Sequence, residues 1–520
     1  MTRVLVAGGG TVGLSTALFL AHHGVPALVV ERADGPSTHP RATGLGFRTL
    51  EFFRQAGIAD AVEAVSVRRS AGLGKISAPT LVTADLPDTP PATPNSPNVA
   101  ASRHSPSVLR GTCPQDRLDA ALLTAARERG ATVEYSTTLV SFEQDDTGVT
   151  AVLDGPDGRR TERADYLVAA DGGRSEVRAT LGIGTTGPGA VGKPLLNILF
   201  RADLTPYTKG HHFANCTITT PESPGMLVTV DAEKDWIFHT ELGDEPVDAF
   251  PPDRCAALVR AAVGVPDLPV EVLSVLPWRV RGLLADRFRA GRVVLAGDAA
   301  HAVPPLGAFG ANTGIADAHN LAWKLAAVLD GTAGPALLDT YEAERRPVAA
   351  LALDQALRRL EDPRLHWEQG PAAAAARAAA GVVNAPVVHL GYRYDSAAVL
   401  GARPGLPSTE DVVLDGSPGS RLPHAWLAEN LSTLDLVGRK LTLLTGPGGD
   451  WPRTGDFDVH VVEDDEWLRA TGISDGGAVL VRPDHFIAWR GRPDELAGAV
   501  ARVLARGPLS AGRPRRKVDA

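Results

Sequence analysis

The feature that most constrains the fold is a glycine-rich turn between an apolar strand and a helix near the N-terminus. Residues 4–7 predict a short buried strand, and residues 12–22, which begin with Val12, predict a helix. Gly8, Gly10 and Gly13 lie between them in G-x-G-x-x-G spacing. The first glycine permits a tight turn, the second lets the backbone approach a pyrophosphate, and the third lets helix and strand pack closely. The helix N-terminus would attract the phosphates.

A second apolar strand completes the unit and ends in an acidic residue. Residues 27–30 predict this strand, and Glu31 follows it, with Arg32 next. Glu31 lies about 20 residues past the glycines, where a carboxylate that binds ribose is expected. The alternative is a glycine-rich turn in an ordinary α/β unit. With strand, helix, strand and acid all in place, we favour a dinucleotide-binding unit, although these residues do not decide which dinucleotide binds.

Bulk composition excludes several classes of protein. At 520 residues the chain is long enough for two or three domains, and 44% hydrophobic and 22% charged residues are typical of a globular protein. The net charge of −9 argues against nucleic acid as a partner. Three widely spaced cysteines indicate neither a disulfide framework nor a zinc site, so we expect no metal and a reducing cytoplasm. We also expect no signal peptide and no membrane span.

Changes in the pattern of apolar, Pro and Gly residues along the chain predict an α/β fold with several domains. Apolar strands alternate with helices in the first part, short strands separated by Pro and Gly follow, and a further small α/β pattern ends the chain. The expected parts are a first nucleotide-binding segment at 1–184, whose loop 72–107 adds to the ligand side, an antiparallel sheet at 185–278, a second nucleotide-binding segment with long helices at 279–390, a small α/β domain at 391–507 and a flexible tail at 508–520.

Two further motifs specify the dinucleotide. Residues 165–172 join a buried strand to Asp171-Gly172, and residues 297–301 read Gly-Asp-Ala-Ala-His, followed by Pro304-Pro305-Leu306-Gly307. Each motif alone is weak. Together with the N-terminal turn, and in this order, they indicate bound FAD and hence redox chemistry that the flavin performs.

With all three motifs in view, residues 1–360 resemble the class A FAD-dependent aromatic monooxygenases. Asp171, Ser175 and Arg178 match the middle motif, and the sequence after the third motif continues through Gly310 and a helix with Trp323-Lys324. The resemblance implies a Rossmann-like FAD domain with an inserted antiparallel substrate sheet. The C-terminal unit resembles the thioredoxin-like appendage of the polyketide and phenol hydroxylases, and it has no cysteine for thiol chemistry because Cys255 is the last one.

The resemblance also implies cofactor contacts for individual residues. Asp298 would hold a hydroxyl of the ribityl–ribose region, and Asp171 would position the cofactor. The backbone at the start of a helix would face the flavin pyrimidine edge, and Arg41 would contact the isoalloxazine from a mobile loop. The expected cofactor-binding residues are Gly8, Gly10, Val12, Gly13, Glu31, Arg32, Arg41, Gln115, Asp171, Gly297, Asp298, Pro305, Gly307, Gly310, Ala311, Asn312 and Thr313.

The substrate side is less well defined by sequence. Ala308 stands where the family usually has Gly, and Phe309 where Gln is frequent, so the flavin environment or the substrate shape would differ from those of the typical member. His301 is better explained by packing or capping near the flavin than by catalysis. The candidate substrate contacts are Phe213, Trp236, Phe238, Pro304 and Phe309, and for the first three core packing is an equal alternative.

The function implied by the resemblance is hydroxylation of an aromatic ring. NADPH or NADH would reduce FAD, and O2 would form a flavin C4a-hydroperoxide that hydroxylates a polycyclic, polyketide-derived phenol. No catalytic acid or base is identifiable from the sequence. A simple phenol, Baeyer–Villiger oxygen insertion, a dehydrogenase that passes electrons elsewhere, and a protein that binds FAD and ligand without turnover are the alternatives. A homodimer is left open.

Overall fold

The computed structural model describes residues 2–68, 74–87, 97–109, 111–211, 213–231, 233–368, 370–473 and 476–506. The chain divides into two compact units. The first contains Met1–His319, Arg346–Leu390 and Ser408–Val412, and the second contains Asn320–Arg345, Gly391–Pro407 and Val413–Ala520. The second unit thus includes a segment that the sequence had assigned to the FAD domain. The expected flexible tail at 508–520 lies outside the described residues.

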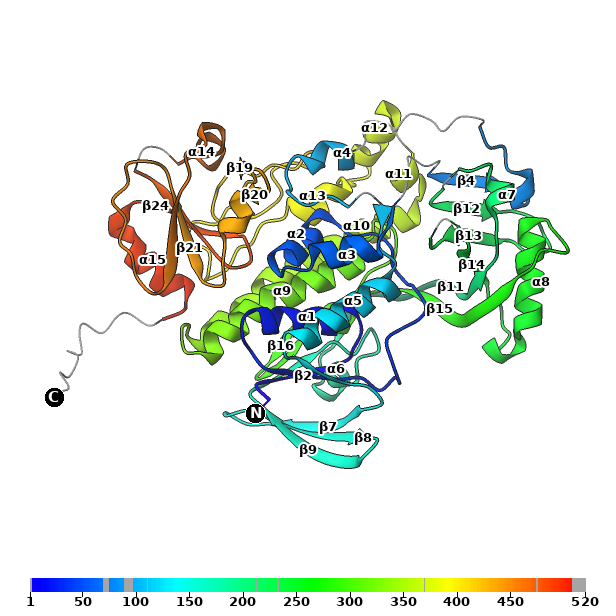
Figure 1. Ribbon diagram of the computed structural model, residues 1–520, viewed down its shortest axis with the longest axis horizontal. Helices are drawn as coiled ribbons and strands as arrows, with labels where there is room; N and C mark the ends of the chain where they lie inside the picture. Colours follow the sequence, from blue (N-terminus) through cyan, green and yellow to red (C-terminus); the bar gives the residue numbers. More distant parts are fainter. Residues whose placement is uncertain are drawn as a thin grey trace. The chain divides into compact units, whose positions relative to one another are not determined.

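A mostly parallel sheet forms the base of the first unit (Figure 1). Its order is β16-β17-β10-β1-β2-β6, with β1 paired in parallel to both β10 and β2. Four of these strands are apolar and fully buried runs, as expected of a parallel sheet covered on both faces. The strands are β1 (Val4–Ala7), β2 (Ala27–Val30), β6 (Thr132–Glu134), β10 (Tyr166–Ala169), β16 (Arg289–Ala290) and β17 (Val293–Leu295).

Helices connect these strands and cover the sheet. The predicted helix at 12–22 is confirmed as α1, and α5 begins at Gln115. The helix that follows the third motif, α9, begins at Phe309, so its first turn includes Gly310, Ala311 and Asn312. The helices of the first unit are α1 (Thr11–His22), α2 (Phe47–Gln55), α3 (Ala59–Val65), α4 (Pro97–Ser102), α5 (Gln115–Glu128), α6 (Glu176–Thr180), α7 (Thr205–Thr208), α8 (Pro252–Val263), α11 (Arg364–Trp367), α12 (Pro371–Ala379) and α13 (Ala385–Leu390), and α9 (Phe309–Leu329) and α10 (Asp339–Glu361) have residues in both units.

A seven-stranded sheet carries the expected substrate region. Its order is β18-β15-β11-β14-β13-β12-β4, and β4, from the expected loop 72–107, joins its edge in parallel to β12. The same loop also contains α4, where the sequence had predicted irregular structure, and its residues 88–96 lie outside the described part. The strands are β4 (Lys75–Ala78), β11 (Thr185–Arg201), β12 (Asn215–Ile218), β13 (Gly225–Thr229), β14 (Asp235–Glu241), β15 (Glu271–Ala285) and β18 (His301–Ala302).

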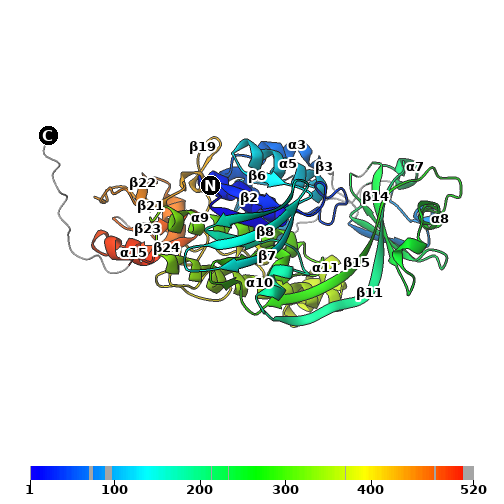
Figure 2. The same cartoon turned by 90° about the horizontal axis from the view of Figure 1, so that it is seen from below.

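Two long strands, β11 and β15, connect this sheet to the nucleotide-binding sheet (Figure 2). They pair antiparallel, with register shifts beside Gly189 and Leu195. Irregularities of this kind bend a strand and increase its twist, which lets one ribbon follow both parts of the unit. The far end of the sheet packs against α8, as Figure 1 shows, and the core between them contains Phe200, Phe238 and Val259.

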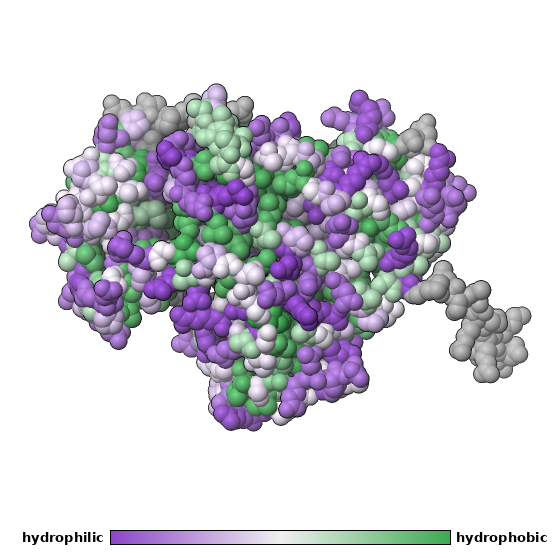
Figure 3. Space-filling model, turned by 180° about the vertical axis from the view of Figure 1, so that it is seen from behind, coloured by the Kyte–Doolittle hydropathy of each residue, from purple (hydrophilic) through white to green (hydrophobic). Residues whose placement is uncertain are grey.

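Two small sheets complete the first unit. One is an antiparallel sheet of β7 (Thr138–Gln144), β8 (Val149–Gly155) and β9 (Gly158–Ala164). β3 (Val67–Arg68) pairs with β5 (Gly111–Thr112). No helix in the described ranges is long and apolar enough to cross a membrane. On the face that Figure 3 shows, hydrophilic residues surround smaller hydrophobic areas.

The second unit contains a four-stranded sheet in the order β22-β21-β23-β24. β21 pairs in parallel with β22 and antiparallel with β23. Because side chains alternate along β21, Leu443 packs in one core with α15 and Leu444 packs in another with Trp467 of α14. The elements are β19 (Trp426–Ala428), β20 (Leu431–Ser432), β21 (Leu441–Thr445), β22 (Phe457–Val461), α14 (Asp465–Thr471), β23 (Ala478–Val481), β24 (Ile487–Gly491) and α15 (Leu496–Val503).

A fully buried ion cluster lies in the same unit. The Glu344 carboxylate accepts hydrogen bonds from both terminal nitrogens of Arg482, at 2.5 and 2.7 Å, and from Lys324 Nζ at 2.7 Å. Asn320 and Ser396 also donate to it, at 2.9 and 2.7 Å. Burial alone would raise the pKa of Glu344, but the two cations hold it well below its usual value. Lys324 shares this anion with Arg482, so burial still lowers its pKa to about 8.

Candidate functional site

The glycine turn adopts the geometry that its spacing predicts. Gly8 has a φ of 105°, and a Cβ at this position would lie 2.3 Å from the Ala170 carbonyl oxygen. A Cβ at Gly13 would lie 1.9 Å from the Gly8 carbonyl oxygen, so strand and helix approach too closely for any side chain. Gly10 is different, because a Cβ there would meet nothing within 4 Å. The open side of Gly10 therefore leaves room for a ligand at the N-terminus of α1.

The acid after β2 lies directly beside this turn. Glu31 accepts a hydrogen bond from the Gly9 backbone N–H at 2.7 Å and another from Ala33 at 2.9 Å. Its carboxylate is thus fixed at the edge of the turn, where the ribose of a dinucleotide is expected. The neighbouring Arg32 is exposed.

Gln115 lies at the other side of the turn, at the start of α5. Its side-chain amide donates to Thr11 Oγ1 at 2.9 Å, and Thr11 donates to the carboxylate of Asp119 at 2.5 Å. Asp119 is buried, and this burial raises its pKa to about 7. A polar network therefore ties α5 to the first residue of α1.

The middle motif meets the third motif through Arg178. This side chain donates to the carbonyls of Ala299, at 2.7 Å, and Gly173, at 3.1 Å. Asp171 accepts from the Val177 backbone N–H at 3.1 Å through one oxygen. Its other oxygen, Oδ1, is buried and has no hydrogen-bond partner among the described residues. A buried acceptor of this kind calls for a donor from a bound molecule.

The third motif packs directly on the first. Cβ atoms at Gly297 and Gly314 would lie 2.7 and 2.6 Å from Val12 Cγ2. Asp317 of α9 fixes the turn, because it accepts from Gly297 N–H at 3.1 Å and lies 2.7 Å from His301 Nε2. His301 is completely buried against Phe288, which places it in the packing of the turn.

Asn312 ties the start of α9 to the loop that carries Arg41. Its Oδ1 accepts from Gly46 N–H at 2.8 Å and from Thr49 Oγ1 at 2.6 Å, and its Nδ2 donates to the Gly44 and Ala308 carbonyls at 3.1 and 2.7 Å. The Asn312 side chain is therefore occupied within the protein, and it can contribute to a cofactor site by positioning the loop.

Ala308 and Phe309, the two unusual residues where α9 begins, have different consequences. Ala308 has a φ of 55°, a left-handed conformation that favours glycine. The Phe309 ring is buried, 5.1 Å from the ring of His389 and 5.3 Å from the Arg359 guanidinium, and it does not line the cavity described below. Phe309 thus packs inside the first unit, whereas the sequence had suggested a role in the flavin or substrate environment. Gly307 (φ 100°), Gly310, Ala311 and Thr313 complete this turn and the first turn of α9.

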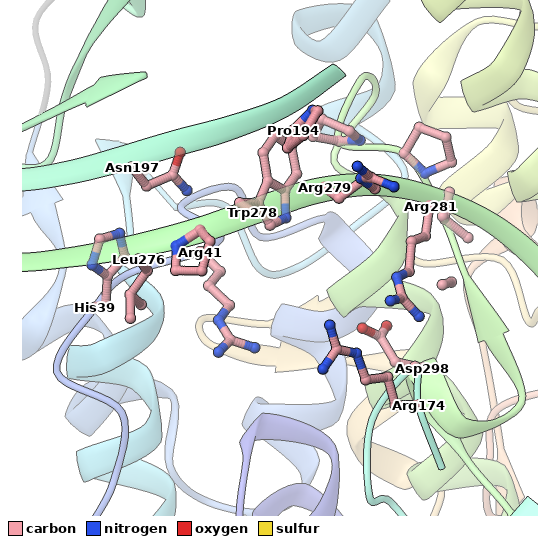
Figure 4. A pocket seen from close by; sticks show the side chains of 16 residues that line it. His39, Arg41, Arg174, Pro194, Asn197, Leu276, Trp278, Arg279, Arg281 and Asp298 are labelled. Carbon is pink, nitrogen blue, oxygen red and sulfur yellow. The ribbon is translucent and has the colours of Figure 1, made fainter. Parts of the chain in front are cut away.

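A cavity of about 470 Å³ connects the third motif to the seven-stranded sheet (Figure 4). Asp298, Pro304 and Pro305 line it from the third motif, and Arg41 extends into it from the loop after β2. Desolvation by the surrounding protein raises the pKa of the Asp298 carboxyl, and the positive charges of His301 and Arg41 partly oppose this shift. The volume of the cavity lies within the range of small-molecule sites.

The sheet contributes the other wall, with residues that were not predicted from the sequence. Asn197 of β11 and Leu276, Pro277 and Trp278 of β15 line the cavity. Phe213, Trp236 and Phe238 do not. They belong to the core on the α8 side, so their placement favours the packing alternative.

Four arginines surround the cavity, and only one carboxylate, Asp298, is among the lining residues. They are Arg41, Arg174, Arg279 and Arg281. The resulting positive potential favours anionic ligands. Apart from Arg41, these arginines were not predicted from the sequence.

Comparisons with known proteins identify the class. Residues 1–356 match the FAD binding domain family, and residues 415–507 match the C-terminal domain of aromatic-ring hydroxylases. The chain is 41% identical to the tetracenomycin A2 monooxygenase-dioxygenase of Streptomyces glaucescens, over 97% of each chain. It is 38% identical to the aklavinone 12-hydroxylase of Streptomyces purpurascens, over 96% of this chain and 97% of that protein.

Solved structures agree with this assignment. Aklavinone-11 hydroxylase, in a ternary complex with FAD and aklavinone, matches with a TM-score of 0.81 and 35% identity over 97% of this chain and 99% of that one. The flavin-dependent monooxygenase PieE, in complex with FAD and substrate, matches with a TM-score of 0.84 and 34% identity over the same shares. The fold and site are those of a flavoprotein that binds FAD. The chain belongs to the FAD-dependent aromatic-ring hydroxylases and is a monooxygenase.

The residues of the three motifs fit FAD. The open side of Gly10, the N-terminus of α1 and the Glu31 carboxylate are suited to the pyrophosphate and ribose. The unpartnered oxygen of Asp171 and the Asp298 carboxylate lie in the middle and third motifs. When bound, FAD supplies the redox chemistry and the activation of O2. The protein binds FAD and the substrate, orients them and shields them from water.

Proposed function

We propose that this monooxygenase hydroxylates a polycyclic aromatic phenol of polyketide origin. The observation that carries this proposal is the cavity between the third motif and the sheet, because it has a flat apolar side chain, Trp278, beside the polar Asn197. Aromatic ligands pack well on such a wall. By their names, the relatives above act on tetracenomycin A2 and aklavinone, and two others, 42% and 39% identical to this chain, carry "polyketide hydroxylase" in their names, which supports the same substrate class here.

The same proposal includes NADPH or NADH as the reductant. The cationic lining of the cavity suits the phosphates of a pyridine nucleotide. Of the individual contacts predicted from sequence, we retain Gly8, Gly10, Val12, Gly13, Glu31, Arg41, Asp171, Gly297, Asp298, Pro305 and the first turn of α9 as the proposed FAD site, with Arg32 and Gln115 at its edge and Pro304 on the substrate side. The absence of any cysteine after Cys255 favours a structural role, or one in dimer contacts, for the C-terminal domain.

An anaerobic titration tests the function. NADPH or NADH is added to the FAD-loaded protein with and without emodin, a polycyclic phenol, and bleaching of the flavin absorbance is followed. We expect emodin to accelerate bleaching, and we expect mass spectrometry after admission of O2 to show one added oxygen on an aromatic carbon. Oxygen inserted next to a carbonyl would indicate Baeyer–Villiger chemistry. Rapid bleaching without any oxygenated product from a panel of phenols would contradict the proposal.

A further inference from the structure

One end of the cavity has a buried histidine with a free ring nitrogen. His39 lies in the loop between β2 and Arg41, and it lines the cavity although only 3% of the residue is exposed to solvent. Figure 4 shows His39 near Leu276 and Asn197, at the end away from Arg174, Arg281 and Asp298. This end of the cavity therefore combines one imidazole with the wall of the sheet.

Hydrogen bonding distinguishes the two nitrogens of His39. Nδ1 lies 3.2 Å from Ser274 Oγ on β15. Nε2 is buried and finds no hydrogen-bond partner in the described part of the chain. When Nδ1–H donates to Ser274, Nε2 carries a lone pair and can accept a hydrogen bond. A buried unsatisfied acceptor costs stability, and a ligand hydroxyl would remove that cost.

The surroundings keep this imidazole neutral. Burial, and secondarily the positive charge of Arg41, lower the pKa of His39 to about 4. His239, whose pKa is also lowered to about 4 by burial and by His39, lies within hydrogen-bond distance of Asn197 Oδ1 through its Nδ1. No carboxylate among the cavity-lining residues named for this end opposes these effects, because Asp298 lies at the other end. A neutral imidazole retains its lone pair at physiological pH.

The side-chain amide of Asn197 adds a hydrogen-bond donor to the acceptor that His39 provides at this end of the cavity. When His239 Nδ1–H donates to Asn197 Oδ1, the Asn197 Nδ2 group is left to donate towards the cavity that this residue lines. A polyketide-derived aromatic ring commonly carries both hydroxyl donors and carbonyl acceptors. Both kinds of substrate group thus find a partner at this end.

We propose that His39 Nε2 accepts a hydrogen bond from a phenolic hydroxyl of the substrate, so that His39 both orients the ring and increases its electron density. This inference rests on the proposed function, since it concerns the same substrate. The hydroxyl proton is shared with Nε2 and is not transferred. A more electron-rich ring is the better acceptor of an electrophilic oxygen, so the contact favours hydroxylation near that hydroxyl.

Emodin and its monomethyl ether physcion provide the test. They differ in one hydroxyl, the one that makes no internal hydrogen bond and can therefore donate to the protein. Binding to the oxidised, FAD-loaded enzyme is measured from the perturbation of the flavin spectrum, without NADPH. We expect emodin to bind about tenfold more tightly than physcion, as expected for one buried hydrogen bond. His39→Leu should bring the two affinities to within about twofold.

Two further variants make the test decisive. His366→Leu is the matched control, because the pKa of His366 is also lowered to about 4 by burial and His366 does not line the cavity. It should retain the preference for emodin. Ser274→Ala removes the hydroxyl that accepts the Nδ1 proton, and the proton can then move to Nε2. This variant should also lose the preference, and it decides the question if His39→Leu does not retain FAD.

The outcomes separate the inference from the proposed function. If the wild-type enzyme prefers emodin and both His39→Leu and Ser274→Ala keep that preference, the role of His39 is wrong while phenol binding stands. If the wild-type enzyme binds emodin and physcion equally, the role of His39 is also wrong. If it binds and oxygenates no phenol at all, the proposed function itself fails. Loss of the preference in the two variants and its retention in His366→Leu supports the inference.

Discussion

Gly314→Ala should weaken FAD binding by forcing the first and third motifs apart. The added Cβ would lie 2.6 Å from Val12 Cγ2 and 3.1 Å from Gly297 Cα. Non-bonded carbon atoms prefer about 3.5–4.0 Å, so the closer contact is short by about 0.9 Å. Val12 lies in the first turn of α1, and Gly297 begins the turn that carries Asp298. The Gly297 backbone cannot yield without moving a cofactor-binding segment, and Val12 can yield only by leaving its preferred side-chain rotamer in the helix.

The magnitude follows from two opposing effects. Overpacking of this kind costs about 1–3 kcal/mol. An alanine inside a helix is more favourable than glycine by about 0.5–1 kcal/mol, which offsets part of that cost. At the midpoints of these two ranges the net loss is about 1.3 kcal/mol, which corresponds to roughly eightfold weaker FAD binding if the strain is relieved when FAD leaves.

The assay is titration of the apoprotein with FAD, followed by quenching of flavin fluorescence. Val12→Ala removes the methyl group that the new Cβ would meet, so the double variant Gly314→Ala/Val12→Ala should recover part of the lost affinity. Gly498→Ala is the control for helix propensity, because it lies in α15 and its Cβ would meet nothing within 4 Å. FAD affinity of Gly314→Ala within twofold of wild type, or no recovery in the double variant, would refute the close contact of the two motifs.

Three further changes test the energetics of the chain. Glu344→Gln should lower the unfolding free energy by about 3–5 kcal/mol, because Lys324 then loses its carboxylate partner in a fully buried site and Arg482 is left with Asp484. Chemical denaturation measures this, and Glu361→Gln, at the exposed end of the same helix, should cost less than about 0.5 kcal/mol. Ala308→Gly should raise the midpoint of thermal unfolding. Removing the strain of alanine in a left-handed conformation gains about 1–2 kcal/mol, which exceeds the entropic cost of glycine, about 0.5–1 kcal/mol. An unchanged or lower midpoint would contradict backbone strain at this residue. Lys324 has a pKa of about 8 in the folded protein, against an ordinary value of 10.5. Between these two pH values the unfolded chain binds more protons than the folded one, so the free energy of unfolding should rise with pH. Urea midpoints measured from neutral pH to about pH 10 should show this rise for wild type and a smaller one for Lys324→Met.

Local glycine patterns made the cofactor unit predictable from the sequence. Gly8 and Gly13 occupy positions where any Cβ would overlap a backbone carbonyl, so the spacing of the glycines carries the geometry directly. The parallel strands were equally visible, because Val4–Ala7 and Tyr166–Ala169 are continuous apolar runs. In these segments the residue types that favour the local turn or strand are also the ones that the packed fold requires.

Contacts between distant segments were not predictable in the same way. The expectation for Asn312 concerned its backbone, and the sequence does not indicate that its side chain bonds to Gly44, Gly46 and Thr49, more than 260 positions earlier in the chain. Nor does the sequence indicate that the Phe309 ring packs against His389. A single sequence records that these side chains are polar or aromatic, and it does not record which distant segment they meet.

The substrate wall shows the same difficulty, and it also shows which signal remains. Strand β14 is buried on both faces, so alternation of polar and apolar residues does not show which face meets the substrate. Trp236 and Phe238 lie on the α8 side, and the intervening strand positions therefore face the other way. That second face is distinguished by one polar residue in each of two neighbouring strands. In β14, His239 follows three apolar residues, and in β11, Asn197 interrupts the apolar run from Leu195 to Phe200. A polar group in a buried apolar strand needs a partner, and here the two residues bond to one another beside the cavity. In a sheet covered on both faces, such polar interruptions are therefore better indicators of the ligand side than the large aromatic residues.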